Sequence, residues 1–163
     1  MPRNIIVEGE DDVAYVRTLL SRIGVEKDAI TVRSVGGKRL LAKELQAAAS
    51  LGNSDTVDLV DLDQPSIYDA RLEAAKQLGA PQHMVFAAVP SIEAWLFGDV
   101  ENALSYAGNK VSQSIIQRLP LPEEIPYPKH VAMNVFRAPG TGRYSSENFA
   151  RILTSMNINV AVS

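Results

Sequence analysis

The sequence predicts an α/β fold, in which a parallel sheet of about four strands is flanked by helices and followed by an irregular helical C-terminal extension. Two observations predict it. Short β-branched segments alternate four times with helix-forming segments across residues 1–100, with short connections. Acidic residues recur where these strands should end, and open α/β sheets bind ligands at that edge. We expect residues 1–100 to form the core and residues 101–163 to pack on the same domain.

The first half of the core is predicted as strand, helix, strand, helix. Residues 4–8 contain three consecutive apolar residues and indicate a short buried strand. From Asp11 or Asp12 the apolar residues follow helical spacing until Gly24, which favours a helix end. Segment 29–35, AITVRSV, has the β-branched alternation of a strand, and the Ala- and Leu-rich segment 39–50 is typical of a helix.

The second half of the core repeats this order. Segment 56–63, TVDLVDLD, predicts a strand that ends in acids, and segment 66–80 predicts a helix. Segment 83–89 predicts the fourth strand, after which a helix begins within 91–99. In the extension, VSQSIIQRL predicts a helix, the proline-rich segment 120–130 an extended loop, and segment 145–156 a last helix capped by Ser145 or Ser146.

Composition excludes several functional classes. The chain has no cysteine and two histidines, which removes thiolate catalysis and leaves oxygen as the ligand for any metal. The net charge of −3 counts against a protein that coats nucleic acid by bulk charge. No apolar run approaches the roughly 18 residues of a membrane span, and the N-terminus lacks the apolar segment of a signal peptide. We therefore expect a cytoplasmic protein without membrane contact.

Carboxylates gather at the predicted carboxyl ends of the strands. Glu8 follows the first strand, Asp61 and Asp63 end the third, and Ser91 and Glu93 follow the fourth. Parallel strands share a direction, so these residues are expected at one edge of the sheet. Asp61 and Asp63 would point to the same face of a continuous strand, where they repel each other unless a cation lies between them.

Each acid also has a purely structural interpretation. Asp12 stands near a helix start, where the helix dipole favours a carboxylate. Asp63 would start a turn before Pro65, and Glu93 would lie in the first turn of a helix. Asp58 is out of alternation with Asp61 and is left out of the predicted site. Glu8, directly after a buried strand, has the weakest structural explanation.

The combination resembles the Toprim domain, the metal-binding module of topoisomerases, bacterial primases and several nucleases. The resemblance rests on IIVEGEDD, VGGKRLL and VDLVDLD and covers residues 4 to about 98. The resemblance is most detailed to the OLD-like (overcoming lysogenization defect) branch. In that branch, a second acid lies four residues after the Glu of the first strand, and a Ser-x-Glu segment follows the fourth strand. Asp12 and the segment SIE match these features. The resemblance implies a Toprim/Rossmann-like fold.

The resemblance also implies a nuclease that hydrolyses phosphodiester bonds in DNA or RNA with two Mg²⁺ (or Mn²⁺) ions. Glu8, Asp61 and Asp63 would form the core of the metal site and act in catalysis. Asp12, Ser91 and Glu93 would complete the ligand set. The branch places a catalytic Lys in a later segment; here Arg143 follows Gly142, and Lys129 is the other candidate. Four cationic residues are candidates for holding the phosphate, namely Lys38, Arg39, Arg137 and Arg143.

Two other functions remain open on the sequence. A phosphoacceptor receiver module also has acids after its first strand and an Asp after its third, but receivers put two adjacent acids at the first position without a Glu-Gly turn. The second alternative is a binding or sensor module with a Toprim fold, which would have weak or no catalysis and would act with a partner ATPase. It stays open because the expected Lys is replaced or displaced.

Overall fold

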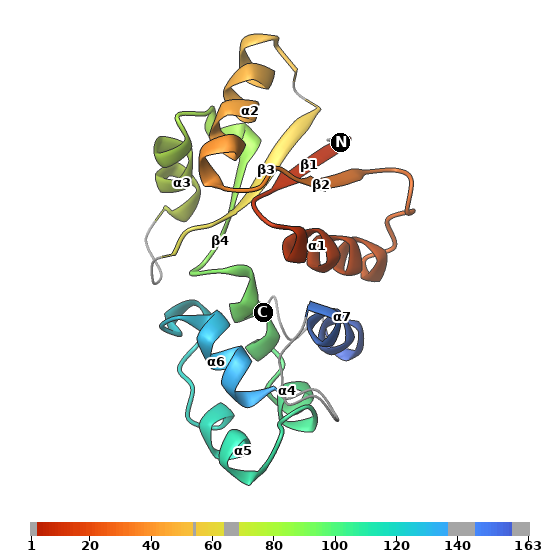
Figure 1. Cartoon of the computed structure of the whole chain (residues 1–163), viewed down its shortest axis with the longest axis vertical. Coiled ribbons are helices and arrows are strands. Elements are labelled where there is room, and N and C mark those ends of the chain that lie inside the picture. Colours follow the sequence, from red (N-terminus) through yellow and green to blue (C-terminus); the bar gives the residue numbers. More distant parts are fainter. Residues whose placement is uncertain (1–2, 54, 64–68, 137–145, 158–163) are drawn as a thin grey trace. The chain divides into compact units, whose positions relative to one another are not determined.

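The computed structural model describes residues 3–53, 55–63, 69–136 and 146–157. The chain divides into two compact units (Figure 1). Unit 1 contains Met1–Leu62 and Ile67–Ala88, and unit 2 contains Asp63–Ser66 and Val89–Ser163. The polypeptide therefore passes from one unit to the other three times. The predicted division at residue 100 stays a prediction.

Unit 1 is built on a four-stranded sheet in which every strand is parallel to its neighbours, in the order β2-β1-β3-β4 (Figure 1). The strands are β1 (Asn4–Val7), β2 (Thr31–Ser34), β3 (Thr56–Asp61) and β4 (Val85–Ala88). The parallel α/β fold predicted from the alternation is confirmed. Glu8 follows β1, which pairs directly with β3, the strand that ends at Asp61.

Three helices pack on this sheet because each has an apolar face. Helix α1 (Glu10–Arg22) contacts β1 and β2 and buries Tyr15 and Val16. Helix α2 (Lys38–Ser50) contacts β3 and buries Leu41 and Leu45, which lie one turn apart. Helix α3 (Ala70–Leu78) contacts β4 and α2. The predicted helix over 66–80 is thus shorter among the described residues, where the Asp69 carboxylate caps its start and Gly79, with φ of 61°, ends it.

Unit 2 is helical. It consists of the 3₁₀ segments η2 (Ile92–Phe97) and η3 (Pro122–Glu124) and the helices α4 (Val100–Ser105), α5 (Lys110–Ile116), α6 (Pro128–Val135) and α7 (Ser146–Ser155). Segment η2 is its centre, since it contacts α4, α6, α7 and η3. The rings of Phe97 and Phe136 stack there, 5.3 Å apart between centroids.

The predictions fail most clearly around the prolines. Segment 120–130 was expected to be an extended loop, but η3 and the start of α6 lie within it. Each begins with proline, which suits a first helical position because that position needs no amide donor. The helix expected from residue 91 is a 3₁₀ segment, η2. A third short 3₁₀ segment, η1 (Gln82–Met84), precedes β4.

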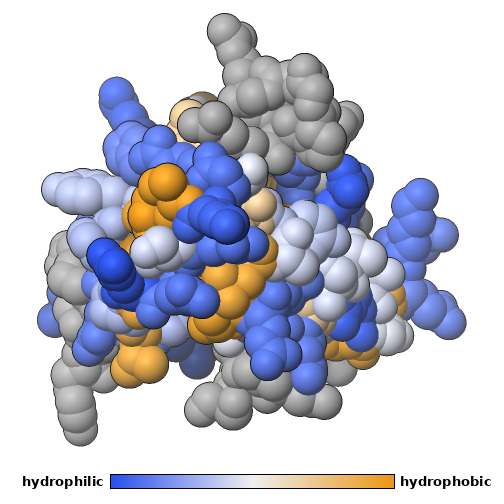
Figure 2. All heavy atoms as spheres, turned by 90° about the horizontal axis from the view of Figure 1, so that it is seen from below, coloured by the Kyte–Doolittle hydropathy of each residue, from blue (hydrophilic) through white to orange (hydrophobic). Residues whose placement is uncertain are grey.

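Apolar side chains also reach the surface of unit 2. On α5, Val111 is 69% exposed and Ile115 is 41% exposed, and both line a cavity of about 340 Å³ between Lys110 and Arg118. Figure 2, which views the molecule from below, shows apolar patches set among hydrophilic residues. Within the described part of the chain, no helix is long and apolar enough to cross a membrane.

Candidate functional site: carboxylates at the sheet edge and a buried glutamate network

In unit 1, Glu8 follows the last residue of β1 and is half-buried. Its backbone carbonyl accepts hydrogen bonds from the amides of Gly36 and Gly37, at 3.0 and 3.1 Å. These glycines have φ of 80° and 132°, a conformation that side chains with a Cβ rarely adopt. The Gly-Gly pair therefore turns the chain between β2 and α2 so that two amides fix the backbone of Glu8. Sequence reasoning noted this pair but missed its role.

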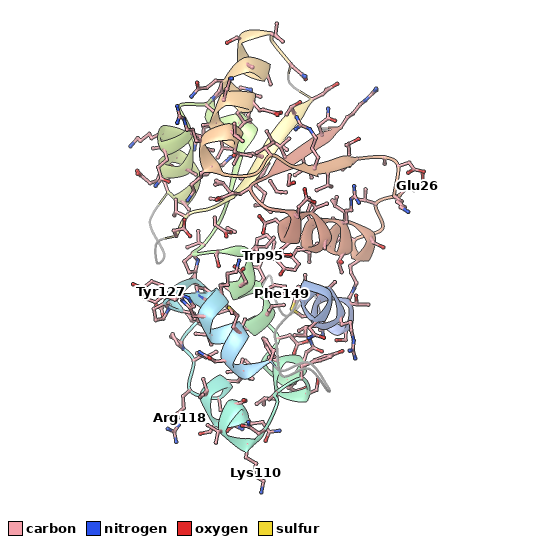
Figure 3. The ribbon with its side chains drawn as sticks, viewed as in Figure 1. Glu26, Trp95, Lys110, Arg118, Tyr127 and Phe149 are labelled. Atoms are coloured by element: carbon pink, nitrogen blue, oxygen red, sulfur yellow. The ribbon has the colours of Figure 1, made fainter. Side chains whose placement is uncertain are left out.

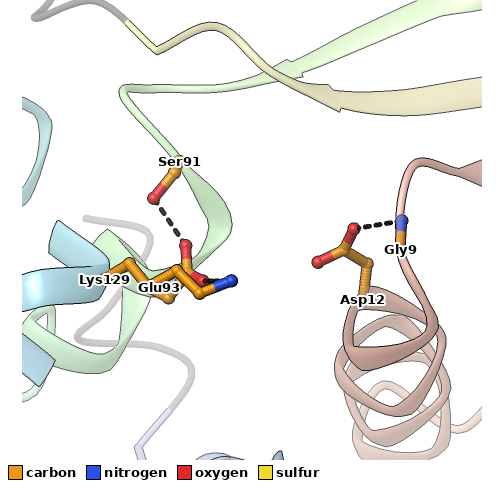
Figure 4. A network of polar contacts seen from close by, with 5 residues as sticks. All are labelled: Gly9, Asp12, Ser91, Glu93 and Lys129. Carbon is orange, nitrogen blue, oxygen red and sulfur yellow. Dashed lines mark hydrogen bonds and ion pairs between the residues drawn. The ribbon is translucent and has the colours of Figure 1, made fainter. Parts of the chain in front are cut away.

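Asp12 lies in the first turn of α1, and its structural role is explicit. Its Oδ2 accepts a hydrogen bond of 2.9 Å from the amide of Gly9, the N-cap residue (Figure 4). This is half of a capping box, and the carboxylate also lies at the positive end of the helix dipole. The contact holds the turn between β1 and α1 in shape, directly after Glu8.

The two aspartates of the DLD motif differ in backbone setting. Asp61 is the last residue of β3 and pairs with Ala88 of β4. Asp63, assigned to unit 2, has a left-handed φ of 59°, and its amide donates a 2.8 Å hydrogen bond to the carbonyl of Pro90. The strand was expected to continue to residue 63, with both carboxylates on one face. That expectation is wrong, because β3 ends at Asp61 and its alternation does not reach Asp63.

In unit 2, three predicted site residues meet in one network. The Glu93 side chain is 4% exposed, and its Oε2 accepts a 2.6 Å hydrogen bond from the hydroxyl of Ser91 (Figure 4). The ammonium of Lys129 lies 3.8 Å from Oε1 of the same carboxylate. Ser91 and Glu93 flank the start of η2, whereas Lys129 comes from the first turn of α6. A buried carboxylate is thus held by a hydroxyl on one side and faced by a cation on the other.

Asp58, which was left out of the predicted site, is the most unusual carboxyl of unit 1. It lies in β3 beside Ile6 of β1 and Val85 of β4, and all three residues are fully buried. Neither carboxylate oxygen has a hydrogen-bond partner among the described residues. Burial raises its pKa to about 7, and the nearby amides of Phe86 and of Asp58 itself oppose this shift only in part.

The other predicted cations lie on α2 or outside the described residues. Arg39 is exposed at the start of α2, next to Lys38, which is half-buried. Arg137 and Arg143 lie outside the described residues, so their predicted roles stay predictions.

The oxygen donors at the sheet edge are of the chemical type that hard divalent cations prefer. Within the part of the chain that the structure describes, no three acids or histidines are grouped closely enough to hold a metal ion by themselves. Mg²⁺, however, usually keeps several waters and takes only one or two carboxylates plus substrate phosphate. Glu8 and Asp61, at the ends of neighbouring parallel strands, meet that smaller requirement in residue type and strand position.

No protein-family model and no curated protein matches the sequence. Solved structures do. The C-terminal region of the Burkholderia pseudomallei OLD protein matches with a TM-score of 0.58 at 17% identity, covering 99% of this chain and 96% of that one. The C-terminal region of the Xanthomonas campestris pv. campestris OLD protein matches with a TM-score of 0.58 at 18% identity, covering 98% and 88%. The chain has an OLD-like Toprim fold.

The OLD-like Toprim fold includes unit 2 as well as the sheet, since the matches cover nearly the whole chain. The sheet order alone would not have separated this fold from a receiver, because receiver-type proteins also use the strand order 2-1-3-4. The helical unit that follows β4 therefore contributes much of the difference between this fold and that of a receiver.

Proposed function

We propose that the chain is a divalent-metal-dependent phosphodiester hydrolase that acts on nucleic acid. The observation that supports this most is the position of Glu8 and Asp61, which follow and end neighbouring parallel strands of an OLD-like Toprim sheet. Open α/β sheets carry their ligand sites at that edge. A pair of carboxylates there is suited to a cation that in turn binds phosphate.

In this proposal, Glu8 and Asp61 hold Mg²⁺ or Mn²⁺. Asp12, Asp63, Ser91 and Glu93 are the further proposed oxygen ligands, taken from the sequence pattern. When bound, a divalent ion of this kind polarises the phosphodiester and makes water a better nucleophile at neutral pH. The Gly36 and Gly37 amides contribute by fixing the backbone from which the Glu8 carboxylate extends.

Lys129 is the proposed cation for the phosphate. Its ammonium lies 3.8 Å from Glu93 while its side chain is 61% exposed, so one end of the network faces water, where a substrate arrives. A lysine Nζ can neutralise phosphate charge and also donate a proton to the leaving oxygen. An arginine does the second poorly because its guanidinium keeps its proton far above neutral pH. Lys129 is for that reason favoured over Arg143 for proton transfer.

The test is cleavage of supercoiled plasmid and of a structured RNA in Mg²⁺, in Mn²⁺ and in EDTA. Asp61→Asn should remove cleavage, because it removes a metal-binding charge with little change in shape. Asp11→Asn is the matched control, since Asp11 is an exposed acid of the neighbouring turn with no proposed role. Activity that persists in EDTA, or equal activity of both variants, would refute the proposal.

A binding module with the same fold is the second candidate function. It is favoured by the finding that no three acids or histidines of the described residues form a metal site alone. Metal binding without cleavage in any of these conditions would support it. The receiver alternative makes a different prediction, namely a stable phosphoaspartate on Asp61 after incubation with acetyl phosphate, visible in the intact mass.

A further inference from the structure

Tyr127 has a strained backbone. Its φ of 54° and ψ of 57° are left-handed, and it directly precedes Pro128. A residue with a Cβ is disfavoured in this conformation, and a following proline favours an extended one instead. Among the described residues other than glycine, only Asp63 shares a positive φ, and a short polar side chain tolerates it better. Such strain persists where the surrounding structure enforces it, often at functional sites.

The residue with this strained backbone exposes its aromatic ring to water. Tyr127 is 77% exposed, the largest exposed fraction of an aromatic residue in the described part of unit 2 (its position is labelled in Figure 3). Burial therefore does not account for the ring. An exposed tyrosine presents a flat apolar face together with a polar hydroxyl, a combination that suits recognition surfaces.

A second ring stands beside the first. The imidazole of His130 lies 6.1 Å from the Tyr127 ring between centroids, tilted by 55°, and His130 is itself exposed. This is the edge-to-face range of aromatic pairs, in which one ring supports the edge of the other. Because Tyr127 stays 77% exposed in the presence of His130, much of its ring surface remains open to a ligand.

A cationic side chain adjoins the two rings on α6. The first turn of α6 has no acidic residue and contains Lys129 and His130. Lys129 lies between the two ring residues in sequence and is the residue proposed above to hold phosphate. An aromatic platform next to such a cation is the arrangement by which proteins bind single-stranded nucleic acid, stacking the base and neutralising the backbone.

We propose that Tyr127 and His130 form a stacking platform for an unpaired nucleobase, so that the substrate is single-stranded nucleic acid. This inference specifies the substrate of the proposed hydrolase, and it depends on that proposed function for the bond that is cleaved. Stacking on an aromatic ring tolerates any base, since every base has a π face. A base within a duplex is already stacked on its neighbours and gains nothing from the platform unless it is extruded.

The test measures binding in EDTA, so that cleavage plays no part. Fluorescence anisotropy compares a labelled twelve-residue oligothymidylate, a twelve-residue oligouridylate, a blunt-ended DNA duplex without unpaired bases, and a twelve-residue abasic DNA with the same phosphates but no bases. Tyr127→Gly and Tyr127→Asn remove the ring while accepting the left-handed backbone, and Tyr127→Phe keeps the ring. Val111→Ala, at an exposed apolar position of α5, controls for general loss of apolar surface.

The wild type and Tyr127→Phe should bind oligothymidylate alike, and Tyr127→Gly should weaken that binding by about tenfold or more. Binding of the abasic strand should be equally weak in the wild type and in Tyr127→Gly, because the lost contact is ring to base. A loss for oligouridylate matching that for oligothymidylate extends the platform to RNA, and a loss for oligothymidylate alone restricts it to DNA. Unchanged affinity in Tyr127→Gly, or an equal loss on the abasic strand or the blunt-ended duplex, would overturn the proposal.

Failure of the platform and failure of the hydrolase are distinguishable. If the wild type cleaves nucleic acid and Asp61→Asn does not, but Tyr127→Gly binds and cleaves normally, the platform is wrong and the hydrolase stands. If oligothymidylate binding depends on Tyr127 but no metal supports cleavage, the hydrolase is wrong and the platform stands. Thermal melting of each variant checks folding, and Tyr127→Asn serves where Tyr127→Gly does not fold.

Discussion

Asp58 shows how one side chain can act against the stability of its own unit. The carboxyl lies among hydrocarbon neighbours on β3, without a hydrogen-bond partner in the described structure. Its pKa is raised from 3.8 to about 7 by burial. Period-two alternation correctly separated Asp58 from Asp61, but nothing in the sequence indicated a fully buried carboxyl. Whether a strand residue is completely buried depends on neighbouring residues from distant segments, and the pattern of a single sequence does not show which residues these are.

The raised pKa predicts a specific pH dependence. Between pH about 4 and pH about 7 the unfolded chain has an ionised Asp58 while the folded chain keeps the proton, so the free energy of unfolding falls as pH rises. The loss reaches about 4 kcal/mol near pH 7 and stays constant above it. Asp58→Val should therefore stabilise the protein by a few kcal/mol at pH 8 and little at pH 4.

Urea denaturation of the wild type and of Asp58→Val at several pH values measures this difference directly. Subtracting the two curves removes the contribution of the other acids, which is common to both. A difference that does not grow between pH 4 and pH 7 would show that Asp58 is ionised in the folded protein.

At the scale of elements, the turn between β2 and α2 holds the backbone of Glu8, a predicted metal ligand, in place. The amides of Gly36 and Gly37 donate to the carbonyl of Glu8, and Gly37 has φ of 132° with ψ of 157°, a region that only glycine adopts readily. Gly37→Ala should destabilise unit 1 by about 1–3 kcal/mol, because the new residue is strained wherever the turn keeps its shape.

Gly9→Ala is the control for this variant. Gly9 has an ordinary φ of −119°, and a Cβ there would lie 3.4 Å from Oδ2 of Asp12, a normal van der Waals distance. Thermal melting should show a clear loss for Gly37→Ala and a small change for Gly9→Ala. Equal effects would mean that the backbone at Gly37 is free to adjust.

The secondary-structure elements differ in how well the sequence alone predicts them. The four strands were predicted because a buried parallel strand needs a local run of β-branched residues, and segments such as "AITVRSV" provide one. The sequence does not predict helix α6, because the four prolines of segment 120–130 disfavour the interior of a helix. Pro128 instead begins one. The ion pair between Glu93 and Lys129 joins residues far apart in sequence, so no local pattern could have revealed it.

At the scale of the whole molecule, metal binding should appear as stability. A ligand that binds only the folded state raises the melting temperature by mass action. At 100 times its Kd, a single divalent ion should raise the melting temperature by about 5–10 °C for a chain of this length. We expect this rise with Mg²⁺ or Mn²⁺, and we expect Asp61→Asn to abolish it.

Differential scanning fluorimetry with and without each ion measures the rise. Asp11→Asn, in which an exposed acid outside the proposed site is neutralised, should keep it. A melting temperature that responds equally to metal in Asp61→Asn and in Asp11→Asn would show that the ions act on general surface charge.

The path of the chain has a consequence for proteolysis. Asp63 belongs to unit 2 although β4 of unit 1 comes later in the sequence, and its amide donates to the Pro90 carbonyl within unit 2. A single protease cut after Ala88 would give two fragments, of which the N-terminal one still carries a piece of the other unit. After such a cut, the hydrogen bond from the Asp63 amide to the Pro90 carbonyl would join two separate fragments. Separating these fragments would require that bond to be broken.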